Sequence, residues 1–238
     1  MELYPEPLFR VAGDRGLLME LGEEISPKIQ ERIRAMLLAL EETPLSGVVE
    51  FLPGYRSLAV VYDPLSTSFG LLREELRQVH QSLASLALPP PRLVEIPVCY
   101  GGELGPDLGF VAHHNQLTEQ EVVSLHSGSD YLVYMIGFTP GFPYLGGLDE
   151  RLHTPRLASP RKKVPAGSVG IANGQTGVYP IQSPGGWQLI GRTPVQLFDP
   201  GREEPFLLAA GDTLRFVAID YPRYQELSAD RVSTGRRS

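Results

Sequence analysis

The sequence is poor in the features that most often reveal a function. Its 238 residues include one cysteine, Cys99, and one tryptophan, Trp187. A single thiol excludes an intramolecular disulfide framework and fits a reducing compartment. No segment approaches the roughly 20 consecutive apolar residues that span a bilayer, so we expect no membrane role. The first residues also lack the basic and apolar regions of a secretory signal, which makes the cytoplasm the expected location.

Positive charge and standard catalytic motifs are scarce too. The net charge of -7 has the wrong sign for a protein held to nucleic acid by electrostatics, so nucleic acid is not an expected partner. The chain contains no Gly-x-x-x-x-Gly-Lys-Ser/Thr phosphate loop, no Gly-x-Ser-x-Gly nucleophile elbow and no Cys-x-x-Cys pair. We therefore expect no complete standard active site, and any catalysis is expected to be shared with other chains.

The first part of the chain predicts a two-layer α/β sandwich. Short β-rich runs at 7–12, 16–21, 48–52 and 57–62 are joined in pairs by turns that contain Gly or Pro. Apolar residues recur every three or four positions after Ser26-Pro27 and again over 69–83, and this spacing predicts two helices. The order ββαββα then places both helices on one face of a sheet over residues 1–88. Pro89-Pro90-Pro91 cannot continue a helix and forms the expected linker, 89–91.

Beyond the linker, short runs punctuated by Gly and Pro predict a β-barrel domain over residues 92–225. One well-marked helix is expected at 118–126, opened by a capping box of Thr118 and Glu121, and a turn or two of helix at 107–114. The expected strands cover 93–98, 131–138, 168–172, 178–181, 187–190, 195–198 and 213–219. Residues 226–238 lack apolar periodicity and predict a flexible tail. The expected fold class is α+β.

An aromatic loop is the first candidate for a functional site. The run 137–148 carries Phe138, Phe142 and Tyr144 in a segment stiffened by proline and freed by glycine. Such a loop forms the wall of a ligand or partner site, or it only plugs one end of the barrel. Both readings stay open from the sequence.

A cationic stretch follows, and it stands out in an acidic protein. Its members lie between Pro155 and Pro165 and are Arg156, Arg161, Lys162 and Lys163. These side chains suit a carboxylate, a phosphate or the acidic residues of a partner, although a run of charges is also typical of a solvated face.

A glycine turn near the single tryptophan is the third candidate. It comprises Gln182, Gly185, Gly186 and Trp187, with Arg192 a few residues later. Backbone N–H groups around such glycines form anion-binding nests, but the same sequence also suits a hairpin turn whose tryptophan packs in the core.

The histidines give weaker signals. His126 ends the capped helix and serves either as a proton carrier or as a hydrogen-bonding group at a helix C-terminus. His113 and His114 are adjacent, so they point about 100° apart on a helix and do not form a His-x-x-x-His metal site. We expect no protein-bound metal.

Four segments in a fixed order resemble the KipI family. They are GFTPGFPYLGGL, PRLASPRKKVPAGSVGIA, QTGVYPIQSPGGWQLIGRTP and the Gly-Asp of AAGDTLRF. The resemblance implies an α/β N-terminal domain followed by a cyclophilin-like β-barrel. It also implies the small subunit of a bacterial ATP-dependent 5-oxoprolinase, which converts 5-oxoproline, ATP and water to glutamate. Such a subunit is inactive alone and acts with a KipA/PxpC-like subunit and a PxpA-like protein, and the assembled complex uses the ATP.

The resemblance and the side-chain chemistry together assign expected roles. His126, Arg161 and Arg192 are the candidate catalytic residues. The candidate residues for binding the small-molecule substrate or an anion are Arg156, Lys162, Gln182, Gly185, Gly186, Trp187, Phe138, Phe142 and Tyr144. Alternative readings are an inhibitor of a sensor histidine kinase and a carboxyltransferase-like subunit of a urea carboxylase or allophanate system. Prolyl isomerisation, by analogy with the barrel alone, ranks lower because fold does not imply function.

Overall fold

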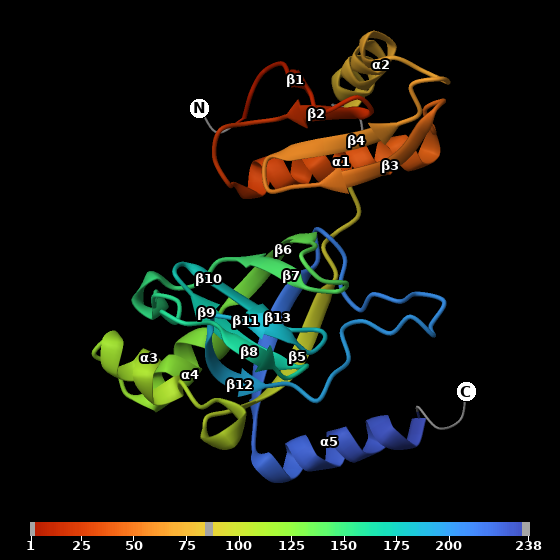
Figure 1. Cartoon of the computed structure of the whole chain (residues 1–238). Helices are drawn as coiled ribbons and strands as arrows, with labels where there is room; N and C mark the ends of the chain where they lie inside the picture. The colour runs from red at the N-terminus through yellow and green to blue at the C-terminus, as the bar shows by residue number, and fades with distance from the viewer. Residues whose placement is uncertain (1–2, 84–87, 235–238) are drawn as a thin grey trace. The chain divides into compact units, whose positions relative to one another are not determined.

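A computed structural model describes residues 3–83 and 88–234 of the chain. The chain divides into two compact units, Met1–Pro90 and Pro91–Ser238, so the division falls within the proline run (Figure 1). Among the described residues, no helix is both long enough and apolar enough to cross a bilayer.

The first unit is a four-stranded antiparallel sheet with two helices on one face. The strands lie in the order β1-β2-β4-β3. Their bounds are β1 Leu8–Val11, β2 Gly16–Glu20, β3 Val48–Pro53 and β4 Ser57–Tyr62, and the helices are α1 Pro27–Glu42 and α2 Phe69–Ser82. Alternate residues Leu17, Met19, Leu58 and Val60 of the sheet are fully buried in one cluster with both helices. The predicted two-layer sandwich is confirmed.

Both helices begin where their sequences provide a cap. The Ser26 hydroxyl accepts a hydrogen bond from the backbone of Ile29, and the Ser68 hydroxyl accepts one from Leu71. These bonds satisfy backbone donors that have no partner within the helix. Pro27, at the first turn of α1, has no N–H that needs a partner.

The second unit is built on a seven-stranded sheet in the order β10-β9-β12-β5-β13-β6-β7. The strands are β5 Leu93–Tyr100, β6 Asp130–Ile136, β7 Pro143–Gly146, β9 Ser168–Ala172, β10 Gln175–Val178, β12 Gln188–Arg192 and β13 Thr213–Ile219. The edge strands β7 and β10 lie alongside each other, so the sheet forms a nearly closed barrel. Strands β8 Arg161–Val164 and β11 Ser183–Gly185 pair in a separate two-stranded sheet.

Helices complete the barrel unit. They are α3 Leu108–His114, α4 Glu119–Ser127 and α5 Tyr221–Thr234, with short 3-10 turns η2 Gly102–Leu104 and η3 Glu150–Leu152. The capping box predicted for α4 is present, with Thr118 and Glu121 each bonded to the other's backbone. Val122 of α4 and Val111 of α3 enter the barrel core beside Phe216 and Tyr131.

Three predicted elements differ from the structure. Residues 195–198 are not a strand, because the Val195 N–H bonds to the Thr193 side chain and only Phe198 forms a bridge, to Phe206. The strand predicted at 178–181 lies at Gln175–Val178 instead, since Pro180 has no N–H to give to a sheet. Residues 226–234 of the expected flexible tail belong to α5, whereas 235–238 lie outside the described residues. Asp220 caps this helix by accepting from the Arg223 N–H, a start signal that the sequence analysis missed.

The core of the barrel contains an ionisable ring, His126, with no exposed surface. The Thr176 hydroxyl donates to the Gly170 carbonyl, so it accepts from Nε2 of His126, 2.7 Å away. Nδ1 of His126 then accepts from the Tyr100 hydroxyl at 2.8 Å. The ring also stacks on Phe216, with 4.5 Å between centroids. Burial lowers the pKa of His126 to about 3, so the imidazole is neutral.

The packing of α2 gives a direct test of which face is buried. Leu72 has no exposed surface, whereas its neighbour Leu71 is 63% exposed. Because a cavity replaces buried methyl groups, Leu72→Ala should lower the free energy of unfolding by about 2–5 kcal/mol. Leu71→Ala, the matched control, should change it by less than about 0.5 kcal/mol. Equal effects of the two substitutions in urea unfolding would contradict this packing.

The neutral state of His126 predicts a loss of stability in acid. His126 takes up a proton near pH 6.5 in the unfolded chain but only near pH 3 in the folded chain. Its contribution to the free energy of unfolding is therefore fully present above pH 6.5 and declines as the pH falls toward 3. Lowering the pH from 6.5 to 5 should cost about 2 kcal/mol through His126. His126→Gln should flatten this part of the stability profile. If that variant does not fold, nitrogen NMR of the unaltered protein at pH 5 should still show a neutral ring, and titration near 6.5 would refute the assignment.

Candidate functional site

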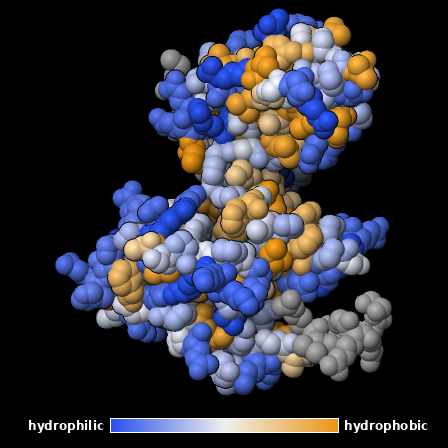
Figure 2. Space-filling view, in the orientation of Figure 1, coloured by the Kyte–Doolittle hydropathy of each residue, from blue (hydrophilic) through white to orange (hydrophobic). Residues whose placement is uncertain are grey.

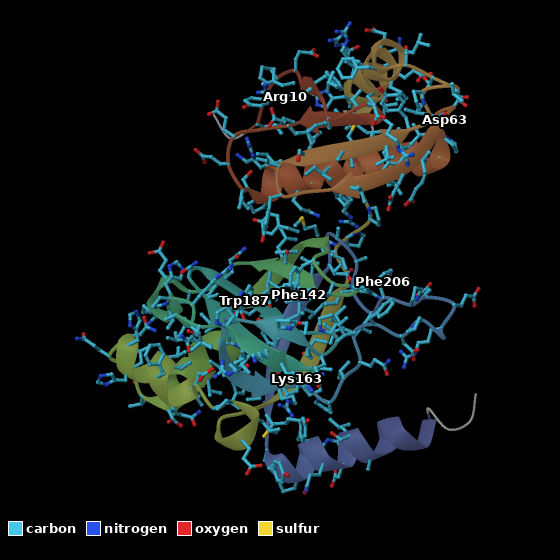
Figure 3. The ribbon with its side chains drawn as sticks, viewed as in Figure 1. Arg10, Asp63, Phe142, Lys163, Trp187 and Phe206 are labelled. Carbon is cyan, nitrogen blue, oxygen red and sulfur yellow. The ribbon has the colours of Figure 1, made fainter. Side chains whose placement is uncertain are left out.

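An aromatic cleft of about 340 Å³ opens in the barrel unit. It lies within the size range of small-molecule sites. Its lining residues are Phe138, Phe142, Tyr144, Arg156, Pro160, Gln175, Tyr179, Pro184, Gly185, Gly186 and Trp187. They come from the 137–148 loop, the segment before β8, strand β10 and the residue after it, strand β11, and the turn between β11 and β12. Figure 3 shows Phe142 and Trp187 side by side at this place.

Phe142 is the hub of the cleft wall, and only 3% of its surface is exposed. Its ring meets Tyr144, Tyr179 and Trp187 edge to face, at centroid distances of 5.3, 5.6 and 5.6 Å. Each such pair contributes about 0.5–1.5 kcal/mol beyond the area it buries. A side chain at Gly185 would collide with the Tyr179 hydroxyl, so glycine is needed for this close packing. The rings of the wall are therefore closely packed on one another.

Phe138 differs from the other rings because 69% of its surface is exposed. Its backbone lies in the left-handed region with a φ of 61°. A bulky residue in that region costs about 1–3 kcal/mol and persists where the surroundings impose it, often at functional sites. The ring touches Phe142 edge to face, with 5.7 Å between centroids.

The polar groups of the cleft favour an anionic ligand. Arg156 is exposed at the lining and forms no ion pair with any acidic residue of the described chain. Burial raises the pKa of Tyr179, and this effect is opposed by a hydrogen bond from the Trp187 backbone and by the charges of Arg156 and Arg161. Tyr179 is therefore a neutral hydroxyl, and Gln175 adds an amide to the same lining. A carboxylate at Arg156 would find a cation and apolar ring faces together.

Asp107 fixes the back of the cleft wall through an ion pair with Arg161. Nη2 of Arg161 lies 2.7 and 2.8 Å from the two Asp107 oxygens, and Nη1 donates to the Trp187 carbonyl. Asp107 also accepts from the Leu189 N–H at 2.6 Å. One carboxylate thus joins the start of α3, strand β8 and strand β12. Arg161 is thus paired with Asp107 and acts as a positioning residue for Trp187.

The structure brings only part of the predicted site together. Seven of the predicted residues line the cleft: Phe138, Phe142, Tyr144, Arg156, Gly185, Gly186 and Trp187. The other five do not: His126 is in the barrel core, Arg161 pairs with Asp107, Lys162 and Gln182 are exposed outside the lining, and Arg192 is half-buried on β12. Nε of Arg192 is buried without a hydrogen-bond partner in the described chain.

Sequence reasoning missed four lining residues, Pro160, Gln175, Tyr179 and Pro184. Gln175 and Tyr179 lie within the segment QTGVYPIQSPGG that carries the family resemblance, so the motif was a usable signal. Among the described residues, no group of three or more His, Cys, Asp or Glu side chains is arranged to hold a metal ion.

The Asp107 contact can be tested with the single tryptophan of the chain. Asp107→Asn should lower the free energy of unfolding by about 2 kcal/mol, because a charged partner of Arg161 is lost. It should also increase the quenching of Trp187 fluorescence by acrylamide. Asp130→Asn breaks a similar two-bond pair with Arg215 that is far more exposed, and it should cost less than about 1 kcal/mol. An unchanged fluorescence response in Asp107→Asn would show that the ion pair does not position the wall.

Comparison with known proteins assigns the chain to a family. The carboxyltransferase domain, subdomain C and D, matches residues 7–208. The 5-oxoprolinase B subunit of Bacillus subtilis (strain 168) is 46% identical over 91% of this chain and 95% of its own length. The corresponding B subunit of Escherichia coli O157:H7 is 48% identical over 86% of this chain and 93% of its own.

Solved structures agree with the fold. The protein TTHA0988 is 42% identical over 87% of this chain with a TM-score of 0.77, and the chain spans 40% of that longer protein. The Kluyveromyces lactis urea amidolyase shares the fold over 97% of this chain, at 22% identity and a TM-score of 0.77, and the chain spans 16% of it. The resemblance to the KipI family is confirmed, and the chain belongs to the carboxyltransferase subdomain C and D family together with these 5-oxoprolinase B subunits.

Proposed function

We propose that this protein is the small subunit of an ATP-dependent 5-oxoprolinase and that its aromatic cleft forms part of the substrate site. The observation that carries the proposal is the match to a 5-oxoprolinase B subunit along 91% of this chain and 95% of the relative. Relatives named urea amidolyase reach 26% identity over 96% of this chain, which supports a carboxyltransferase-like subunit only as a second candidate.

The cleft chemistry suits the substrate. 5-Oxoproline is a compact five-membered lactam that carries one carboxylate. The edges and faces of Phe142, Tyr144 and Trp187 offer apolar contact for the ring. The guanidinium of Arg156, which has no acidic partner within the described chain, is available to the carboxylate. The Gln175 side chain lies in the same lining, where its amide can pair with the lactam amide. We assign Arg156 and Gln175 to binding.

The reaction explains why one subunit is insufficient. A lactam carbonyl is a poor electrophile, so the γ-phosphoryl group of ATP is transferred to its oxygen. Water then adds to the activated carbon and the ring C–N bond breaks as the amine takes up a proton, which leaves a γ-glutamyl phosphate. A second water hydrolyses this acyl phosphate, so that one 5-oxoproline, one ATP and two waters give glutamate, ADP and phosphate. Charge that develops on oxygen needs cations or N–H donors from a prearranged site. Because this chain has no phosphate-loop motif, we place ATP binding on the KipA/PxpC-like or PxpA-like partner, and the isolated subunit is then inactive.

Reconstitution tests the proposal. The chain alone, the partners alone and the complete set should be assayed for ATP-dependent formation of glutamate from 5-oxoproline. Activity is expected only in the complete set. A formed complex that does not hydrolyse 5-oxoproline would reject the proposal, and transfer of carboxylate from a biotin carrier by that complex would favour the second candidate.

Arg156 provides a sharper test within the active set. Arg156→Gln should raise the KM for 5-oxoproline about 10- to 100-fold, since a hydrogen bond between charged groups is lost, with a smaller effect on kcat. Arg73→Gln changes an exposed arginine of α2 in the first unit and should leave both constants unchanged. Equal KM values for the two variants would remove Arg156 from the substrate site.

A further inference from the structure

An exposed aromatic surface continues from the mouth of the cleft to a projecting loop. We propose that this aromatic ridge, formed by Phe138, Phe198 and Phe206, is the docking surface for the polypeptide that carries the remaining carboxyltransferase subdomains. The inference rests on the proposed function in one respect, because that function requires a partner chain. Phe138 is 69% exposed and Phe206 45% exposed. Figure 2 shows apolar groups interrupting the largely hydrophilic surface of the barrel unit.

Direct contacts make the ridge continuous. Phe138 meets Phe142 at 5.7 Å between ring centroids, at the cleft. The same loop turns at Gly141, whose backbone lies close to Phe198. A Cβ atom added at Gly141 would be only 2.7 Å from Cβ of Phe198. Phe198 in turn packs on Phe206 at 5.2 Å between centroids.

The segment 197–207 is an ordered arm that presents Phe206 outward. Backbone bonds from Leu207 to Leu197 and from Asp199 to Pro205 hold its two sides together. Leu197 and Leu208 anchor its base in the barrel core. Figure 1 shows the connection between β12 and β13 extending away from the barrel. Leu197 and Leu208 already fix the base of the arm, and one part of the Phe206 ring packs on Phe198. The part of the ring that stays exposed is the part that a partner can cover.

The family match identifies the occupant. The matching region comprises subdomains C and D of a carboxyltransferase domain, so a complete domain needs further subdomains from elsewhere. In TTHA0988 this chain corresponds to 40% of one longer polypeptide, which shows that a related chain carries additional sequence covalently. A partner that binds the ridge would also cover Phe138, and it would therefore form one side of the cleft mouth. The hollow beside Phe206 is lined by Glu204 together with Arg92 and Arg202, so the complementary patch is apolar with a margin of mixed charge.

The test measures association with matched surface variants. The probe is the polypeptide of the same organism that matches the carboxyltransferase subdomains other than C and D, titrated calorimetrically with the full chain. Phe206→Ser and Phe138→Ser should each weaken the Kd at least 10-fold, as expected for buried aromatic anchors of an interface. Phe110→Ser is the control, because Phe110 is 50% exposed on α3, outside the ridge and the cleft lining, and should leave the Kd unchanged. Circular dichroism of each isolated variant should match the unaltered chain.

Each outcome decides one question. An unchanged Kd for Phe206→Ser and Phe138→Ser, or no complex with the unaltered chain, overturns the docking surface. Light scattering would instead identify a second copy of the chain as the occupant if the unaltered chain self-associates and the two ridge variants do not. That result would also overturn the proposed docking surface. If the ridge-dependent complex, supplied with the PxpA-like protein and ATP, does not hydrolyse 5-oxoproline, the docking surface stands and the proposed function is rejected. If the Phe206→Ser variant binds its partner with unchanged Kd and the complete set hydrolyses 5-oxoproline, the proposed function stands and the docking surface is rejected.

Discussion

The carboxylate of Asp107 is the contact on which the cleft depends. Strands β8 and β11 form their own two-stranded sheet and share no ladder with the seven-stranded barrel. Asp107 connects the two by binding Arg161 of β8 and the Leu189 N–H of β12. The side chains of Asp107 and Arg161 are largely buried, and breaking a largely buried ion pair by removing one partner is strongly destabilising. The position of Trp187, and with it one wall of the cleft, follows from this one group.

Local signals in the sequence predicted much of the fold. Apolar spacing and the serine caps identified α1 and α2, and alternation identified the strands of the first sheet. The sequence reasoning missed β7 and misplaced β10, and both segments contain proline or glycine. Strand β7 begins at Pro143 and is too short to show alternation, and β10 contains Gly177. Each pairs with the strand just before it in the chain, β7 with β6 and β10 with β9. The approach of β7 to β10, which closes the barrel, is recorded by no local pattern.

The site was only partly predictable for a related reason. The aromatic loop and the glycine turn were evident from their composition, and they do meet in the cleft. Burial and distant partners were not visible. His126 has the chemistry of a proton carrier, yet the barrel encloses it between Tyr100 and Thr176. Arg161 is a cation in a cationic run, yet its partner lies 54 positions away in the sequence. Side-chain chemistry names candidates, and only tertiary structure separates free charges from satisfied ones.

The parallel pairing of β5 with β13 has a consequence for synthesis. Leu93 lies opposite Thr213, so the first and last strands of the barrel unit are neighbours at the centre of its sheet. Contacts between residues so far apart in sequence form late and slow folding. The barrel cannot close until Ile219 has left the ribosome, whereas every strand of the first unit precedes Asp63. A nascent chain therefore carries a finished first unit while the apolar strands of the second still wait for their last member, and this interval is when the protein is most exposed to aggregation and to chaperones.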